Sequence, residues 1–154
     1  MRNIWYLLKY PEDKRADCVN RCPEVISSGE MEEILCFQYQ RMIRYGGKWH
    51  LEKRLALPGY MFVDGNKILV KEDVFLTPCQ VPYLRDMCHE GSLIEMSRGI
   101  IRHGNVIVTD GPLKGREPLI RKIDRHKRTA VIEIPFEGGQ KQITVGLEIY
   151  KKEM

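Results

Sequence analysis

The chain has 154 residues, of which 43% are hydrophobic and 30% charged, and a formal net charge of +4 at pH 7. This length holds one ordinary domain or two small ones, and the composition is usual for a soluble protein. No apolar run approaches the ~20 residues of a membrane span, and the N-terminus lacks the cleavage site of a signal peptide, so the sequence predicts a cytoplasmic protein.

The first half of the chain predicts several strands and two helices. The apolar stretch IWYLLKY, residues 4–10, predicts a buried strand that Pro11 closes. A helix is expected from Asp13 to Pro23, because aspartate caps helix starts and proline stops helices. Three further segments follow: strands in EEILCFQYQRMIRY (32–45) and KWHLEKRLALPGYMFVDG (48–65), and a short helix in PYLRDMCHEG (82–91). Strands with a helix packed across them define an α+β layer.

The C-terminal part predicts only β-structure. The pattern weakens over residues 91–104, which are expected to be a connector. Five short strands are then expected, in NVIVTD (105–110), LIRKIDRH (119–126), TAVIEIPF (129–136), KQITV (141–145) and LEIYKK (147–152). Five strands within about 50 residues favour a small closed barrel.

Positive charge is concentrated towards the C-terminus. Residues 1–97 carry 13 Lys and Arg against 14 Asp and Glu, whereas residues 98–154 carry 12 against 7. Seven of these basic residues lie within Lys114–Arg128, beside only two acidic ones. Such a cluster is typical of a nucleic-acid-binding surface, with a solvated charged face as the alternative. The candidate RNA-binding residues are Lys114, Arg116, Arg121, Lys122, Arg125, His126, Lys127 and Arg128.

The alternation of side chains along a strand limits this cluster. Successive side chains of a regular strand point to opposite faces, so Arg121 and Lys122 should face apart. Not every cation can therefore lie on one face unless the strand bends or the hairpin tip at His126–Arg128 is wide.

The sequence shows neither a catalytic motif nor a metal site. It has no P-loop, Gly-x-Ser-x-Gly or HExxH motif. Cys18 and Cys22 stand four residues apart, but no second Cys/His pair stands nearby to complete a zinc site. The odd count of five cysteines predicts reduced thiols, and His50, His89 and His103 are expected at the surface. We therefore expect a protein that is not an enzyme and that has no cofactor.

Three motifs together resemble one protein family. IWYLL at residues 4–8 and LPGYMFV at residues 57–63 resemble the N-terminal (NGN) domain of NusG-like transcription elongation factors. VIVTDGPLKG at residues 106–115 resembles the KOW motif, and the order and spacing of the three also fit. The likeness covers essentially the whole chain. It implies an α+β fold with three parts: an NGN α/β sandwich with an antiparallel sheet (1–92), a linker (93–103) and a small SH3-like KOW β-barrel (104–154).

The resemblance also implies partners. In NusG-like proteins an apolar surface near the second motif binds the clamp helices of the RNA polymerase subunit β′. Carried over to this chain, that surface falls on Tyr6, Leu57, Tyr60 and Phe62, for which core positions are the alternative. The sequence leaves open whether the N-terminal domain also contacts the non-template DNA strand.

The basic segment resembles a particular branch of this family. GREPLIRKIDRHKRTA at residues 115–130 is similar to the LoaP-type specialised NusG paralogs, which act on particular operons. This resemblance implies transcription antitermination, with a nascent leader RNA hairpin as the ligand of the basic segment. The alternative is a general NusG-like elongation factor whose KOW domain binds a protein partner.

Overall fold

The chain folds into two compact units. A computed structural model describes residues 5–9, 34–64, 77–79, 83–88, 91–136 and 138–153. Unit 1 comprises Met1–Cys36 and Leu57–Pro82, and unit 2 comprises Phe37–Ala56 and Tyr83–Met154. These units cut across the predicted ranges of 1–92 and 104–154. They also sharpen the charge asymmetry: unit 1 carries 7 Lys and Arg against 10 Asp and Glu, whereas unit 2 carries 18 against 11, a net charge of +7.

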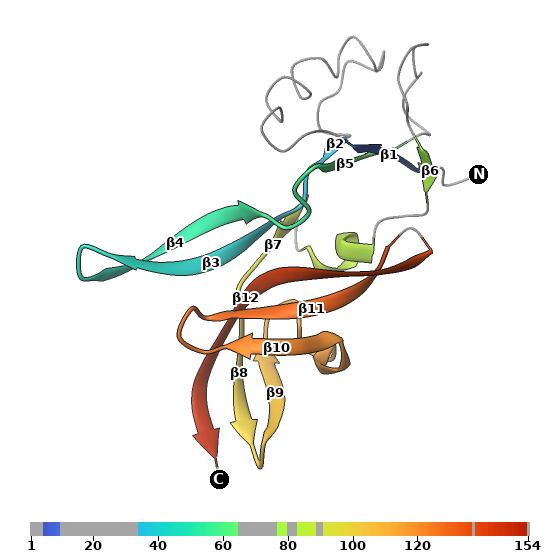
Figure 1. Cartoon of the computed structure of the whole chain (residues 1–154). Helices are drawn as coiled ribbons and strands as arrows, with labels where there is room; N and C mark the ends of the chain where they lie inside the picture. Colours follow the sequence, from blue (N-terminus) through green and yellow to red (C-terminus); the bar gives the residue numbers. More distant parts are fainter. Residues whose placement is uncertain are drawn as a thin grey trace. The chain divides into compact units, whose positions relative to one another are not determined.

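The described residues of unit 1 form an antiparallel sheet in the order β2-β5-β1-β6 (Figure 1). Its strands are β1 (Trp5–Lys9), β2 (Ile34–Leu35), β5 (Tyr60–Asp64) and β6 (Thr77–Cys79). Met61 and Phe62 are neighbours on β5 and point to opposite faces, yet both are buried. Both faces of β5 are therefore covered at these positions.

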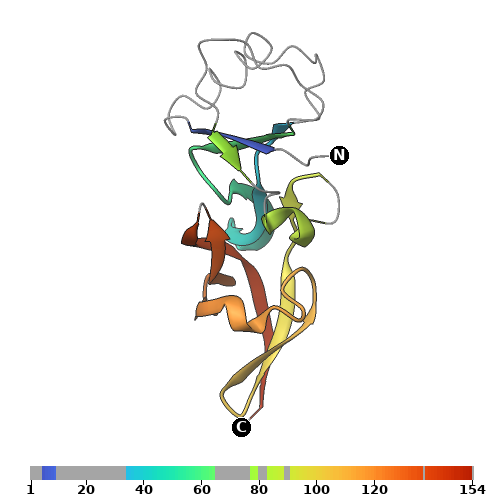
Figure 2. The same cartoon turned by 90° about the vertical axis from the view of Figure 1, so that its right-hand side faces the viewer.

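Unit 2 is built around a five-stranded sheet in the order β10-β11-β12-β8-β9. Its strands are β8 (Ser97–Arg102), β9 (Asn105–Asp110), β10 (Ile120–Asp124), β11 (Thr129–Phe136) and β12 (Gly139–Glu153). The C-terminal end of β12 runs parallel to β8, beside the β8–β9 hairpin (Figure 2), and the other pairings in this sheet are antiparallel.

The two faces of this sheet differ in character. One face forms the core of unit 2, with fully buried apolar side chains that include Ala130, Ile132, Val145 and Leu147. The opposite face, here called the outer face, carries polar side chains such as those of Glu133, Gln142, Thr144 and Glu148. This alternation of apolar and polar residues is the expected pattern for a sheet with one face packed on a core.

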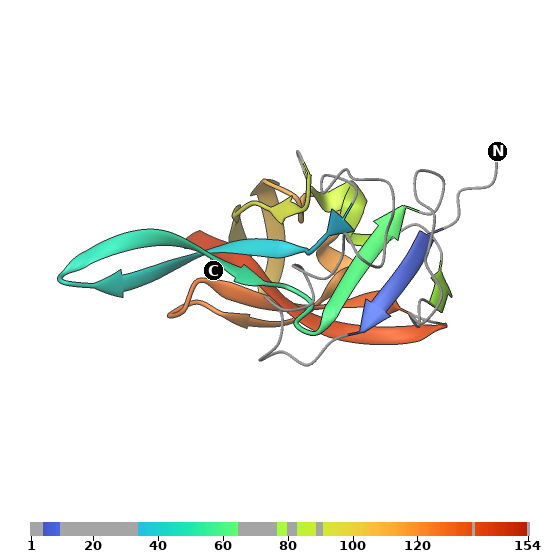
Figure 3. The ribbon, with the colours of Figure 1, turned by 90° about the horizontal axis from the view of Figure 1, so that it is seen from above.

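Unit 2 also contains a long, twisted hairpin of β3 (Gln38–Tyr45) and β4 (Lys48–Leu55), with β7 (Leu93–Ile94) parallel to β3 (Figure 3). β3 and β12 approach each other closely at Gly146. A Cβ on this residue would overlap the backbone oxygen of Gln40 and the sulfur of Met96, so only glycine fits here. The Met96 backbone N–H also donates to Gln40 Oε1, 3.1 Å away. The hairpin is thus fixed to the middle of β12.

The prediction of an α+β fold with an NGN α/β sandwich is wrong. The described residues are mostly β, and their helical elements are two 3-10 helices, η3 (Tyr83–Met87) and η4 (Glu117–Leu119). The helix expected in PYLRDMCHEG is reduced to η3, which begins directly after Pro82. The helix expected from Asp13 to Pro23 lies outside the described residues.

Two predictions about the C-terminal part are also wrong. Residues 91–104 are not only a connector, because they contain β7 and β8. The sequence did not reveal β8 because this central strand has Ser97, Gly99 and Ile100 buried and so lacks alternation. The sheet is also not the expected closed barrel, since no ladder joins β9 to β10 in the described part of the chain.

Candidate nucleic-acid interface

The KOW-like stretch is a packed corner between β9 and η4. Gly111 has a φ of +98°, and a Cβ there would lie 2.6 Å from Ser97 Cα. The buried Ser97 hydroxyl oxygen accepts a hydrogen bond from the Leu113 backbone N–H at 3.0 Å, and the Leu113 side chain is fully buried. Glu117 Oε1 accepts from the backbone N–H groups of Gly115 and Val108. This stretch therefore builds the fold and positions the basic segment that follows it.

A β-bulge in β10 resolves the problem of strand alternation. Ile120 pairs with Ile132 and Lys122 pairs with Val131, so Arg121 is an extra residue in the ladder. An extra residue of this kind shifts the side-chain alternation of the bulged strand. As a result Arg121 and Lys122 are both exposed, and Arg121 Nε donates to Glu133 Oε2 of the outer face at 2.8 Å. The bulge thus brings two neighbouring cations to the same face.

The turn between β10 and β11 holds four more of the eight candidates, Arg125, His126, Lys127 and Arg128. The first three of these side chains are exposed. Asp124 closes the turn, because its Oδ1 accepts a hydrogen bond from the Lys127 backbone N–H at 2.9 Å. This hydrogen bond is the main reason why the pKa of the Asp124 carboxyl lies below its usual 3.8. The carboxylate therefore favours the folded turn while it is ionised.

Replacing Asp124 by alanine should lower the melting temperature at pH 7. A carboxyl with a depressed pKa stabilises the folded protein above its unfolded pKa and loses that effect as the pH falls. The difference in melting temperature between the wild type and Asp124→Ala should therefore shrink below pH 3.8. Thermal melts across this pH range measure it, with Asp124→Asn expected to retain part of the wild-type value. A difference that does not change with pH would contradict the role of the charge.

The eight candidate residues differ in how many contacts their side chains already make within the protein. Arg116 Nη1 donates to the Pro112 carbonyl at 2.8 Å, and Arg121 is paired with Glu133. In the described part of the chain, the side chains of Lys114, Lys122 and Arg125 have neither a hydrogen bond nor an ion pair. Lys114 and Arg116 precede β10, whereas the turn follows it. Of these three side chains, those of Lys122 and Arg125 are the nearest to one another in the sequence.

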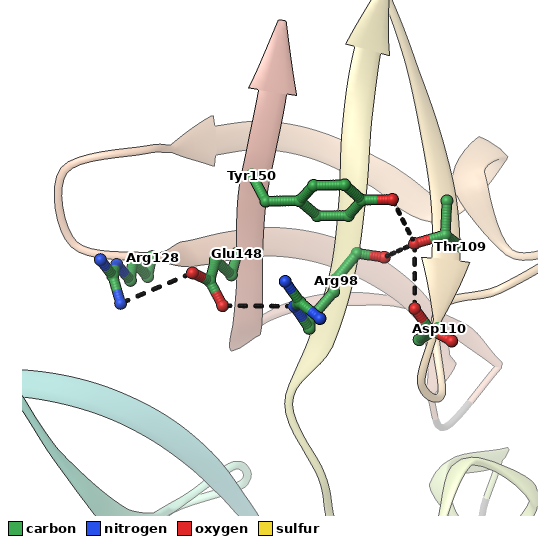
Figure 4. Close-up of polar contacts among 6 residues, drawn as sticks. All are labelled: Arg98, Thr109, Asp110, Arg128, Glu148 and Tyr150. Carbon is green, nitrogen blue, oxygen red and sulfur yellow. Dashed lines mark hydrogen bonds and ion pairs between the residues drawn. The ribbon is translucent and has the colours of Figure 1, made fainter.

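An aromatic and guanidinium strip crosses the outer face beyond this turn (Figure 4). Glu148 on β12 is paired with Arg128 at 3.7 Å and with Arg98 at 3.5 Å. The Arg98 guanidinium lies 4.8 Å from the centre of the Tyr150 ring, and the Arg128 guanidinium lies 3.8 Å from the centre of the Trp49 ring. Tyr150 is 46% exposed and Trp49 38%. Apart from Arg128, these residues were not among the candidates.

The sequence contained one signal for this strip. The hairpin of β3 and β4 carries five basic residues and one acidic residue, together with exposed aromatic side chains. Tyr45 is 60% exposed and stacks on His50, with ring centres 3.6 Å apart. A charge count over residues 1–97 conceals this basic hairpin, because unit 1 is acidic.

The candidate polymerase-binding residues occupy different environments in unit 1. Leu57 and Phe62 are buried, with 2% and 5% of their surface exposed, so both are core residues in this structure. Tyr60 is half-buried, so it is the most accessible of the three candidates whose side chains the structure describes. Tyr6 lies on β1 opposite Val63, and its side chain lies outside the described part of the structure. The polymerase contact stays a prediction.

Other types of site receive little support from the described residues. No three His, Cys, Asp or Glu side chains among them are placed to hold a metal ion, and Cys18 and Cys22 lie outside them. Burial raises the pKa of the Cys88 thiol to about 11, so this thiol stays protonated and unreactive near neutral pH. Among the same residues no helix has the length and apolar character needed to cross a membrane.

Neither the models of known protein families nor the sequences of curated proteins give a significant match to this chain. The resemblance to NusG-like factors therefore depends on the quoted motifs alone.

Proposed function

We propose that this chain is a specialised transcription antitermination factor whose unit 2 binds a leader RNA hairpin. The observation that carries the RNA-binding part is the bulge at Arg121, which places Arg121 and Lys122 on one face, next to the cationic turn at Arg125–Arg128. The net charge of +7 in unit 2 favours a polyanionic ligand in the same way.

The role in transcription comes from the resemblance to LoaP-type proteins. Unit 1 has more acidic than basic residues, which suits a protein partner better than a nucleic acid. RNA polymerase is the partner that the resemblance implies. When one unit is bound to the polymerase, the other unit is held close to the nascent RNA, so its effective local concentration there is raised. Two individually weak contacts then suffice for stable binding, and the function requires no covalent step.

The double variant Lys122→Ala/Arg125→Ala should bind RNA roughly tenfold more weakly than the wild type. The slope of the logarithm of the binding constant against the logarithm of the salt concentration should also become shallower by about two, because each lost phosphate contact removes about one released counterion. The probe is an RNA hairpin selected on the wild-type protein from a pool with randomised loops. Binding is measured by electrophoretic mobility shift over a range of salt concentrations. The two side chains have no partner in the described residues, so folding should be unaffected.

The matched control is Lys151→Ala/Lys152→Ala, which removes the same charge from the exposed end of β12. These residues lie about 15–20 Å along β12 from Gly146, which is opposite the end of the cationic turn. The control should retain most of the affinity. Equal losses in the two variants would mean that only net charge matters, and a failure to enrich any hairpin would favour the protein-binding adaptor.

A further inference from the structure

Arg128 has a backbone conformation that favours glycine. Its φ is +56°, in the left-handed region, where a side chain is strained. The Arg128 carbonyl oxygen also accepts a hydrogen bond from the Leu147 backbone N–H at 3.0 Å, which holds the turn against β12. Strained non-glycine residues of this kind concentrate at functional sites. The presence of arginine at this position, where glycine would be less strained, therefore indicates a role for its side chain.

The environment of this side chain indicates what it could bind. Its guanidinium lies over the indole of Trp49, 3.8 Å from the ring centre, and it is paired with the carboxylate of Glu148. Because Glu148 offsets its charge and would repel a phosphate, this guanidinium suits a phosphate less well than Lys122 or Arg125 does. A flat cation stacked on a partly exposed indole instead suits another flat ring.

We propose that Arg128 and Trp49 form a stacking platform for one unpaired nucleobase of the RNA, an inference that rests on the RNA-binding function proposed above. The platform lies where the cationic turn ends, since Asp124 pairs with Thr129, the residue after Arg128. Phosphates on Lys122 and Arg125 would therefore lie within a few nucleotides of a base on the platform.

The platform would also give unit 2 selectivity for RNA shape. Side chains cannot read the deep, narrow major groove of a regular A-form helix, whereas bases in bulges and loops are free to stack on aromatic rings and guanidinium planes. The cations of β10 and the turn would contact the backbone of the paired stem. The Arg128–Trp49 pair would then select stems that carry an unpaired base next to that backbone.

The fluorescence of Trp49 tests this proposal directly. The chain has two tryptophans, so Trp5→Phe leaves Trp49 as the only one. Titration of this full-length variant with the selected hairpin should quench its fluorescence as the base stacks on the platform. In the same background, Arg128→Gly and Arg128→Ala should each weaken binding by about tenfold, in line with the usual contribution of one stacked base.

The two substitutions at position 128 separate binding from folding. Glycine relieves the positive φ and alanine does not, so Arg128→Gly should melt at a higher temperature than Arg128→Ala. Their RNA affinities should nevertheless fall equally. Wild-type affinity in both variants, or unchanged Trp49 fluorescence in a hairpin complex that still depends on Lys122 and Arg125, would overturn the platform and leave the pair to a protein partner. The RNA-binding function would survive that result.

Discussion

Gly111→Ala is expected to lower the free energy of unfolding by about 3 kcal/mol, from the sum of a strained left-handed residue and an overpacked contact. Gly111 has a φ of +98°, and a Cβ would lie 2.6 Å from Ser97 Cα and 2.7 Å from the Met96 carbonyl oxygen. Both are backbone atoms and cannot rotate away. The new methyl group would therefore push β9 away from the start of β8 and disturb the hydrogen bond from Leu113 to Ser97. Urea unfolding followed by circular dichroism measures the loss.

The second glycine of the KOW-like stretch provides the control. Gly115 also has a positive φ, +80°, but no atom lies within 4 Å of the position that its Cβ would take. Gly115→Ala should therefore lose only about 1 kcal/mol, from backbone strain alone. Equal losses at the two positions would show that the close approach of Gly111 to Ser97 is unimportant.

Local patterns in the sequence predicted the strands well and the layers poorly. TAVIEIPF forms β11 with the predicted bounds, and NVIVTD forms β9, because both alternate over a half-buried sheet. The α+β fold was wrong because both the cap and stop signals and the family likeness predicted a helical layer that the described residues lack. KQITV and LEIYKK were expected as separate strands, yet both belong to β12, in which Gly146 is a point of close contact and not a turn.

The bulge at Arg121 was beyond prediction for a specific reason. A bulge depends on the register between two strands, which the residues of β10 taken alone do not specify. The sequence could show that the cations of LIRKIDRH need a bend, and it could not place that bend. Likewise Trp49 and Arg128 are 79 positions apart, and their contact depends on how the hairpin of β3 and β4 packs against β12. Composition located the basic segment, whereas packing determines which aromatic ring lies beside it.

Gly146→Ala is the substitution expected to separate the hairpin of β3 and β4 from the sheet. Its Cβ would overlap the Gln40 backbone oxygen and the Met96 sulfur. The sulfur belongs to a flexible side chain, but the oxygen can move only together with β3. The loss should be about 2–3 kcal/mol, and because Trp49 lies on β4, its contact with Arg128 should weaken as well. We therefore expect lower stability, a red shift of Trp49 emission in the Trp5→Phe background and weaker RNA binding.

Two further variants show whether this close approach is the cause. Gly139 begins the same strand, and the nearest atom to its Cβ position is 3.8 Å away, so Gly139→Ala should be nearly neutral. In the double variant Gly146→Ala/Met96→Ala, the overlap with sulfur is removed and the overlap with the Gln40 oxygen stays. If the backbone contact dominates, Gly146→Ala should destabilise the Met96→Ala protein almost as much as it destabilises the wild type. Full recovery would instead make the Met96 side chain the obstacle, and the hairpin would then keep its position on β12 by other contacts.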